Sequence, residues 1–223
     1  MIQVLICDDH EIIREGIKVV FEDCPDLKVV ADFGNGADAV RLLREGEVRV
    51  DIIVLDIAMQ GRDGLMVLKQ VKEEFPHLPI LILSNYPDSQ YALYCIKRGA
   101  AGYLNKIVDP DTLISAIRTI AKGGFYITPS VAGYLAGAIR SGNNAQKNQS
   151  SSIEQLSSRE YQVFLLLSKG FTVREIADQL SLSPNTVSTY RTRILNKIGV
   201  RNEVELALYA MRTDSLEDRA LPV

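Results

Sequence analysis

Three aspartates, Asp8, Asp9 and Asp56, directly follow short apolar segments in the first part of the 223-residue chain. Ile2–Cys7 precedes the first two aspartates, and Ile52–Leu55 precedes the third. Short runs of β-branched and aliphatic residues bounded by turn signals are typical of strands buried on both faces. Because ligands of open parallel sheets lie just outside the carboxyl ends of the strands, we expect these carboxylates to meet at one edge.

Carboxylates at such close range raise each other's pKa unless a cation lies among them. Mg²⁺ fits such a site, since it takes oxygen ligands from one or two carboxylates and keeps waters and substrate oxygens for the rest. Ser84 follows the apolar run Ile80–Leu83, and Lys106 follows Ala101–Leu104. A divalent cation, an ammonium and a hydroxyl can together stabilise phosphoryl oxygens. The residues therefore predict a site that handles a phosphoryl group.

Strand and helix patterns alternate five times through the segment that carries these residues. The pattern predicts the α/β class, with a doubly wound five-stranded parallel sheet and right-handed crossovers. The expected strands cover residues 2–7, 27–31, 52–56, 80–84 and 101–104. The expected helices cover residues 10–21, 37–44, 65–75, 89–97 and 110–122, the last with Asp109 as its cap.

A stretch without large apolar residues, Ser141–Ser152, separates this segment from a rear part that has helical periods only. Its composition predicts a flexible linker. We expect a first domain at residues 1–122 and a linker at 123–152 that could include a short helix at 131–140. A second, all-α domain of four helices is expected at 153–212, followed by a tail at 213–223.

Composition places the chain among ordinary globular proteins, with 47% hydrophobic and 24% charged residues. No apolar stretch reaches membrane-spanning length, and the first residues lack the features of a signal peptide. Scattered Cys7, Cys24 and Cys95 fit reduced thiols, so we expect a cytoplasmic protein without a membrane partner. The two histidines, His10 and His77, leave few members for a histidine-based site, and His10 fits a helix-start residue better than a ligand.

The rear domain has the pattern of a helix-turn-helix. Ser157 is expected to cap its first helix, and Thr172 with Glu175 forms a capping box for the second. A tight connection then leads into a longer helix, Asn185–Ile198, and a fourth helix covers Glu203–Met211. Two helices joined by a short turn, the second polar on its outer face, are typical of DNA-binding modules.

Polar side chains of the longer helix are the candidates for DNA contacts. Hydroxyls suit base edges, and we assign Ser188, Thr189 and Thr192 to them. Cations suit phosphates, which supply most of the affinity, and we assign Arg191, Arg193 and Lys197 to them. The net charge of −3 is distributed with only a slight basic excess in the rear domain, so charge alone equally fits a helical bundle with a solvated face.

Five separated motifs in the first domain resemble the receiver domain of two-component response regulators. They are Cys7-Asp8-Asp9-His10, Leu55-Asp56-Ile57-Ala58-Met59, Asp63-Gly64, Leu83-Ser84 and Gly102-Tyr103-Leu104-Asn105-Lys106. The resemblance covers residues 1 to about 122 and implies a flavodoxin-like sheet with strand order 2-1-3-4-5. It also implies that Asp56 accepts a phosphoryl group from a sensor histidine kinase.

The resemblance implies roles for the surrounding residues as well. Asp8, Asp9, Asp56 and the backbone carbonyl of Ala58 would hold Mg²⁺, or Mn²⁺ in its place. Ser84 and Lys106 would contact the phosphoryl group, and Tyr103 would be the switch residue that turns inward when Ser84 moves.

Motifs in residues 153–212 resemble the LuxR-type helix-turn-helix, and the two domains together resemble the NarL/FixJ subfamily. The motifs are Leu156-Ser157-Ser158-Arg159-Glu160, Glu175-Ile176-Ala177, Thr186-Val187 and Lys197-Ile198-Gly199-Val200. The resemblance implies a transcription factor that is controlled by phosphorylation, binds double-stranded promoter DNA and forms a homodimer when active.

Departures from the family's pattern occur at four positions. Gln60 stands where proline is usual, which predicts a looser loop, and Tyr86 is unusual two residues after Ser84. Ser188 and Tyr190 replace a usual lysine and histidine. We expect an altered operator preference or weaker affinity per monomer, and greater dependence on dimerisation.

Two other classes of protein are alternatives. A phosphatase of the haloacid-dehalogenase kind also uses an aspartate nucleophile with Mg²⁺, but it needs an acid two residues later, where this chain has Ala58. A constitutive DNA-binding protein could retain a receiver domain only for dimerisation, although the intact Asp56, Ser84 and Lys106 argue against this. We therefore expect no enzymatic turnover beyond phosphotransfer to Asp56 and slow autodephosphorylation.

Overall fold

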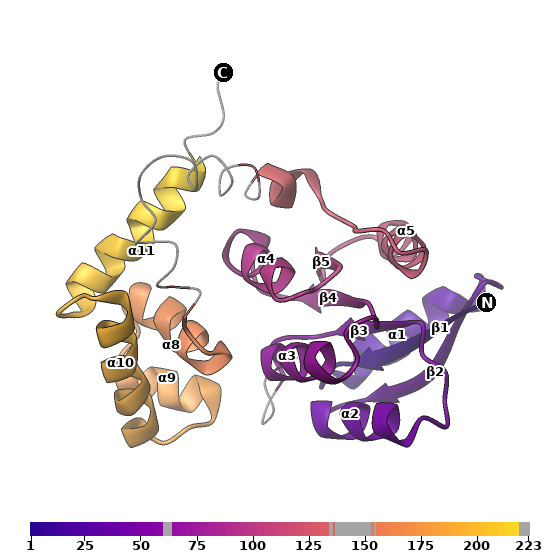
Figure 1. Cartoon of the computed structure of the whole chain (residues 1–223), viewed down its shortest axis with the longest axis horizontal. Coiled ribbons are helices and arrows are strands. Elements are labelled where there is room, and N and C mark those ends of the chain that lie inside the picture. The colour runs from indigo at the N-terminus through magenta and orange to yellow at the C-terminus, as the bar shows by residue number, and fades with distance from the viewer. Residues whose placement is uncertain (60–63, 134–135, 137–152, 154, 219–223) are drawn as a thin grey trace. The chain divides into compact units, whose positions relative to one another are not determined.

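The structure is a computed structural model that describes residues 1–59, 64–133, 136, 153 and 155–218. The chain divides into two compact units, residues 1–132 and 133–223. Strands and helices alternate in the first unit, and the named elements of the second unit are helices (Figure 1). The predicted α/β class and the separate all-α domain are confirmed.

The sheet of the first unit has five parallel strands in the order β2–β1–β3–β4–β5, as expected. The strands are β1 (Ile2–Cys7), β2 (Leu27–Phe33), β3 (Ile52–Leu55), β4 (Ile80–Ser84) and β5 (Gly102–Asn105). In the pairing of β1 with β3, Cys7 lies opposite Leu55. The next residues, Asp8 and Asp56, therefore leave the sheet on neighbouring strands at the same edge.

Helices cover both faces of the sheet (Figure 1). They are α1 (Glu11–Glu22), α2 (Gly36–Glu45), α3 (Gly64–Glu74), α4 (Asp88–Lys97) and α5 (Pro110–Ala121). Val4 and Ile6 of β1 belong to a buried cluster with Ile17 of α1 and Ile117 of α5. Side chains alternate between the faces of a strand, so Leu5 faces the opposite layer, where it is also fully buried. Each such aliphatic side chain stabilises the fold by about 1.5–3 kcal/mol.

The second unit contains α8 (Ser158–Ser168), α9 (Val173–Leu180), α10 (Pro184–Ile198) and α11 (Glu203–Asp218). The predicted caps are confirmed: Ser157 forms a capping box with Glu160, and Thr172 forms one with Glu175. Apolar residues of all four helices are buried and make the core of the unit, among them Val163, Phe164, Ile176, Val187, Ile194 and Leu206.

Several boundaries differ from the sequence prediction by one or two residues, such as the end of β2 at Phe33, and the end of the last helix differs by more. Helix α11 runs to Asp218, so its predicted end at Met211 is wrong, and part of the predicted tail is helical. Apolar periodicity marks where a helix packs, whereas extending an existing helix needs no new nucleation. The expected helix at 131–140 begins earlier, since residues 129–133 are helical, and most of the remainder, like the predicted linker 141–152, lies outside the described residues.

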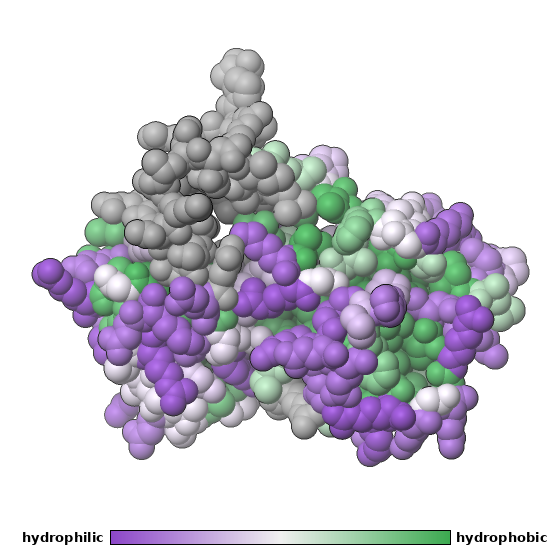
Figure 2. Space-filling model, in the orientation of Figure 1, coloured by the Kyte–Doolittle hydropathy of each residue, from purple (hydrophilic) through white to green (hydrophobic). Residues whose placement is uncertain are grey.

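The surface of the first unit mixes hydrophobic and hydrophilic residues, as Figure 2 shows on the right of the view. Ile12, Ile107 and Phe125 are among the exposed large apolar side chains. Single exposed apolar residues are normal on folded proteins. No helix in the described part of the chain is long and apolar enough to cross a membrane.

Candidate functional site

Side chains from three strand ends of the first unit meet at a buried ion-pair cluster. Lys106, which follows β5, places Nζ 2.6 Å from Oδ2 of Asp8 and 2.8 Å from Oδ2 of Asp56. All three side chains are almost completely buried, with exposed fractions of 4%, 3% and 0%. The sheet order makes this possible, because β1 and β3 are neighbours and the lysine reaches across from β5. The residues that sequence spacing assigned to one edge are therefore brought together there.

Electrostatic coupling holds this cluster in place. Burial raises the pKa of Asp56, while hydrogen bonds from Lys106 and from the Ala58 N–H, 2.9 Å from Oδ1, oppose the rise. Burial alone would lower the pKa of Lys106, but its hydrogen bonds with Asp56 and Asp8 outweigh burial and raise it. The ammonium is therefore charged at neutral pH and offsets the charge of the two carboxylates.

The imidazole ring of His10 lies beside the same cluster. Ligand atoms of Asp8, Asp9, His10 and Asp56 all lie within 4.8 Å of one another, which is close enough to hold one metal ion. His10 precedes α1 at the N-cap position, as expected of a helix-start residue, but its side chain makes no capping hydrogen bond. Its Nδ1 instead lies 3.1 Å from Oδ1 of Asp8 and 2.9 Å from Oδ1 of Asp9. Carboxylates and an imidazole at this spacing suit a divalent cation.

Ser84 at the end of β4 and Tyr103 within β5 lie on neighbouring strands, and both are buried. The Ser84 hydroxyl accepts a hydrogen bond from the Tyr86 N–H at 3.3 Å, and the Tyr103 hydroxyl donates to the Tyr86 carbonyl at 2.8 Å. Burial raises the pKa of Tyr103, and a hydrogen bond with Ser84 limits the rise. The Tyr103 ring is only 1% exposed and thus already lies inward.

The loop after Ser84 is also held by aromatic stacking. The rings of Tyr86 and Tyr91 stack with centroids 4.6 Å apart and planes 18° from parallel. Such offset stacks are worth about 0.5–1.5 kcal/mol beyond the area that they bury. The unusual Tyr86 is therefore packed onto α4, so its role is at least partly to position the loop.

Arg14, which sequence reasoning did not select, contributes to the site, and so does Gly64 of the Asp63-Gly64 motif. Nη1 of Arg14 donates to the Asp8 carbonyl at 2.8 Å, and Nε donates to Asp32 at 3.0 Å. A Cβ on Gly64 would lie 1.9 Å from the carbonyl oxygen of Asp56, so glycine is required where α3 approaches the backbone of Asp56. In the sequence, Arg14 was recognisable only as an arginine between the apolar positions of α1. The loop positions Gln60 and Asp63 lie outside the described residues.

The rear unit carries the expected helix-turn-helix in α9 and α10. Helix α9 ends at Leu180 and is followed by its C-cap Ser181, whose φ of 52° is left-handed. Ser183 caps α10 by accepting a hydrogen bond from the Thr186 N–H. Pro184 occupies the first turn of α10, where no backbone donor is needed. The turn is therefore short and fixes the direction in which α10 leaves it.

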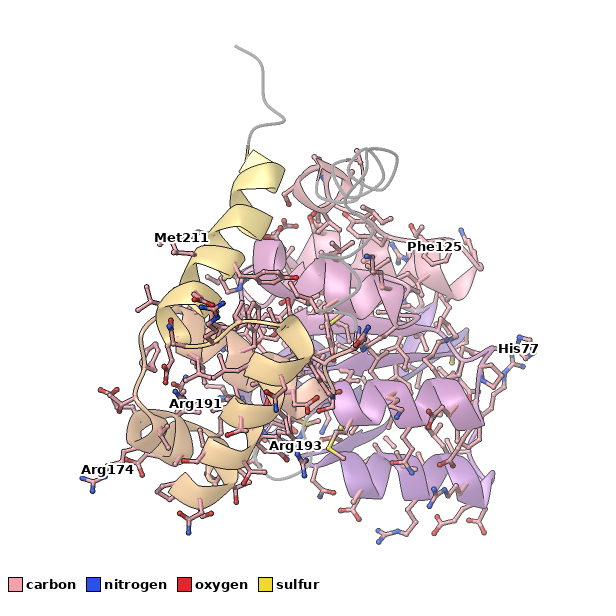
Figure 3. The ribbon with its side chains drawn as sticks, turned by 60° about the vertical axis from the view of Figure 1, so that its left-hand side comes forward. His77, Phe125, Arg174, Arg191, Arg193 and Met211 are labelled. Atoms are coloured by element: carbon pink, nitrogen blue, oxygen red, sulfur yellow. The ribbon has the colours of Figure 1, made fainter. Side chains whose placement is uncertain are left out.

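Four of the six predicted DNA contacts are exposed on α10 and are not engaged in ion pairs within the described residues: Ser188, Thr189, Thr192 and Arg193. The hydroxyls of Thr189 and Thr192 donate to carbonyls four residues earlier, at 3.0 and 3.1 Å. Their oxygens keep lone pairs for further hydrogen bonds. Figure 3 shows Arg193 on α10 and the exposed Arg174 projecting from α9, a second cation that sequence reasoning did not select.

The other two predicted contacts pair with acids of their own unit. Arg191 forms an ion pair with Glu203 of α11. Nζ of Lys197 lies 2.6 Å from Oε2 of the buried Glu160, and it also donates to the Gln155 carbonyl at 3.1 Å. Both cations therefore connect helices of the rear unit.

Family comparisons agree with this arrangement in both units. Residues 4–118 match the response regulator receiver domain, and residues 154–210 match the bacterial regulatory proteins of the luxR family. The chain is a response regulator. Its receiver domain and LuxR-type domain make it a DNA-binding transcription regulator of a two-component system. The resemblance found in the sequence is confirmed.

Relatives match this response regulator over almost its whole length. It is 36% identical to response regulator UvrY of Escherichia coli over 95% of this chain and 94% of that protein. It is 34% identical to response regulator GacA of Pseudomonas aeruginosa over 95% of this chain and 96% of that protein.

Solved structures give the same result at the level of the fold. RcsB of Salmonella enterica bound to promoter rprA in the presence of phosphomimetic BeF₃⁻ matches with a TM-score of 0.58 and 26% identity, covering 94% of this chain and 98% of that one. A structure of two RcsB dimers on two parallel DNAs matches with a TM-score of 0.57 and 27% identity, covering 94% and 97%.

Proposed function

We propose that Asp56 is the phosphoacceptor of this response regulator and that its phosphorylation controls promoter binding by the rear domain. The buried bridge from Lys106 to both Asp8 and Asp56 is the observation that carries the proposal. A buried ammonium shared by two carboxylates is costly for a purely structural role. Beside a phosphoryl group, the same ammonium offsets charge that develops during transfer.

In the proposed reaction an oxygen of Asp56 attacks the phosphorus of a phosphohistidine on a sensor histidine kinase. The new P–O bond makes an acyl phosphate, the P–N bond breaks, and the histidine nitrogen takes up a proton. Lys106 Nζ and Ser84 Oγ hold the phosphoryl oxygens. We infer no enzymatic turnover other than this transfer and slow autodephosphorylation.

The acidic cluster fits the divalent cation that this chemistry needs. Asp8, Asp9, Asp56 and the carbonyl of Ala58 would hold Mg²⁺, or Mn²⁺ in its place. A bound cation would offset charge on the transferring phosphoryl oxygens. The ligand atoms within 4.8 Å support this assignment, and Lys106 alone leaves the carboxylates with excess negative charge.

Ser84 and Tyr103 would report the phosphorylation to the rest of the molecule. Both contact the backbone of Tyr86, so a shift of Ser84 toward a phosphoryl oxygen changes the loop that Tyr103 holds. We infer that this shift favours an active homodimer.

We propose that α10 reads double-stranded promoter DNA. Ser188, Thr189 and Thr192 would contact base edges, and Arg193 would contact a phosphate. Arg191 and Lys197 would add phosphate contacts from within their ion pairs. The RcsB structures, which contain promoter DNA and dimers on DNA, support this use of the fold and the homodimer.

The proposed organisation keeps the receiver at residues 1–122, the linker at 123–152, the DNA-binding domain at 153–212 and the tail at 213–223. We also propose that the protein acts in the cytoplasm. Its three cysteines are buried free thiols, which fits a reducing compartment.

Phosphorylation with a small donor tests the proposal. The full-length chain is incubated with Mg²⁺ and phosphoramidate, and intact mass and binding to promoter DNA are measured. We expect an adduct of about 80 Da, the mass of one transferred phosphoryl unit. The adduct should be lost in Asp56→Asn and kept in Asp51→Asn, a matched aspartate just before β3 and outside the cluster.

Two other outcomes would contradict the proposal. Multiple turnover of a phosphoester would indicate a phosphatase. No adduct, with unchanged DNA binding, would indicate a receiver that serves only for dimerisation.

A further inference from the structure

We propose that His10 is itself a ligand of the divalent cation and shifts the preference of the site from Mg²⁺ toward metals that bind imidazole, such as Zn²⁺. The inference rests on the proposed function in one respect, that a cation lies among Asp8, Asp9 and Asp56. It adds a residue that determines which cation binds.

The position of the ring is the first argument. Nδ1 of His10 is 2.9 Å from Oδ1 of Asp9 and 3.1 Å from Oδ1 of Asp8. The His10 ring also supplies one of the four ligand atoms that lie within 4.8 Å of one another. A cation that contacts both carboxylates would therefore come within reach of this nitrogen. The His10 side chain is 52% exposed, so the cation and its waters can approach from solvent.

The backbone around His10 is the second argument. His10 occupies the N-cap position of α1, where a side chain usually accepts a hydrogen bond from the first turn, yet its ring makes none. Its N–H instead donates to Oδ1 of Asp8 at 2.9 Å, so main chain and side chain both face the same carboxylate. The ring is thus held toward the acidic cluster and away from the helix.

Coordination chemistry gives the direction of the effect. Carboxylates, carbonyls and waters suit Mg²⁺, whereas imidazole suits Zn²⁺ and other late transition metals. An imidazole binds a metal through the lone pair of a ring nitrogen, and any proton on that nitrogen passes to solvent. Removing the ring should therefore weaken Zn²⁺ binding far more than Mg²⁺ binding.

The chain offers a matched control, because it has only two histidines. His77 lies before β4, away from the cluster, and its side chain is exposed (Figure 3). Wild type, His10→Ala and His77→Ala, all full-length and without a polyhistidine tag, are titrated calorimetrically with ZnCl₂ and with MgCl₂. We expect His10→Ala to weaken Zn²⁺ binding by about tenfold or more, a scale typical for the surroundings of a metal site, and to change Mg²⁺ affinity by less than about threefold. His77→Ala should leave both affinities unchanged.

A direct measurement on the wild type does not depend on any variant. The ring nitrogens of His10 and His77 are distinguished by ¹⁵N NMR, and Zn²⁺ should shift Nδ1 of His10 while leaving His77 in place. An equal loss of Zn²⁺ and Mg²⁺ affinity in His10→Ala would mean that the ring only positions the carboxylates, and no loss would mean that it has no part; either result overturns the inference. Absence of binding by both metals in the wild type would contradict the proposed cation site itself, so the two failures are distinguishable.

Discussion

The acidic edge of the receiver sheet and the outer face of α10 use their cations in opposite ways. Lys106 is buried and pairs with the two carboxylates that are proposed to do the chemistry. On α10, Arg191 and Lys197 are about one-third exposed and pair with acids of neighbouring helices. The receiver concentrates charge at its site, whereas the rear domain uses two of the three predicted phosphate-binding cations to hold helices together.

This difference changes what sets DNA affinity. Cations that already have an acidic partner lose part of that interaction when they turn to a phosphate. Arg193 on α10 and Arg174 on α9 are exposed and remain available for phosphates. Because the affinity of one subunit would then be modest, a second subunit on the DNA becomes more important, as the replacement of a usual lysine by Ser188 also suggested.

Removing Lys106 should give the largest effect. We expect Lys106→Met to slow phosphorylation of Asp56 by phosphoramidate about 100-fold, the cost of losing one fixed donor to the transition state. Intact mass against time measures the rate. Lys106→Arg keeps the charge and should recover part of the lost phosphorylation rate. Equal rates in Lys106→Met and wild type would contradict a role for this ammonium.

Much of the receiver could be predicted from the sequence because its site lies at strand ends. Apolar runs identify the strands, parallel pairing aligns their carboxyl ends, and Asp8, Asp56 and Lys106 follow those runs directly. Gly64 had only a turn signal, because the short distance from α3 to the Asp56 carbonyl depends on packing. The inward ring of Tyr103 depends on packing in the same way.

The rear domain was less predictable for a physical reason. Capping boxes are local, so Ser157 with Glu160 and Thr172 with Glu175 could be recognised in the sequence. The pairing of Lys197 with Glu160 joins residues 37 positions apart and depends on how α10 packs against α8. Sequence patterns show which cations occur on a helix, but not which of them have an acidic partner.

A second test breaks the ion pair between Lys197 and the buried Glu160 in the rear domain. We expect Lys197→Met to lower the free energy of unfolding of this domain by about 1–2 kcal/mol, less than for a fully buried pair because the lysine is partly exposed to solvent. Glu160 is 3% exposed and would keep its Ser157 contacts. Hydrogen exchange of the α8 peptide in the full chain measures the change, and unaltered exchange would show that the pair is not stabilising.

Lowering the pH should weaken the same contact between α8 and α10. Burial would raise the pKa of Glu160, but hydrogen bonds from Lys197 and Ser157 outweigh it and hold the pKa below the usual 4.5. The unfolded chain then binds the proton more tightly, so this contribution is present above about pH 4.5 and is lost as the pH falls through the lower folded value. Protection factors of the α8 amides, which are corrected for the intrinsic pH dependence of exchange, should fall less steeply between pH 6 and 3 in Glu160→Gln than in the wild type, and equal slopes would contradict the coupling.

Arg193 should show the smallest effect on stability and the clearest effect on DNA. Since its side chain is exposed and forms no ion pair in the described part of the chain, Arg193→Met should change the unfolding free energy by less than about 0.5 kcal/mol. Loss of one phosphate contact should weaken promoter and nonspecific DNA binding alike and reduce the slope of log K against log salt by about 0.9. Fluorescence anisotropy at several salt concentrations measures both. If Lys197→Met changed the slope as much as Arg193→Met, the ion pair with Glu160 would not weaken the phosphate contact of Lys197, and both cations would contact DNA equally.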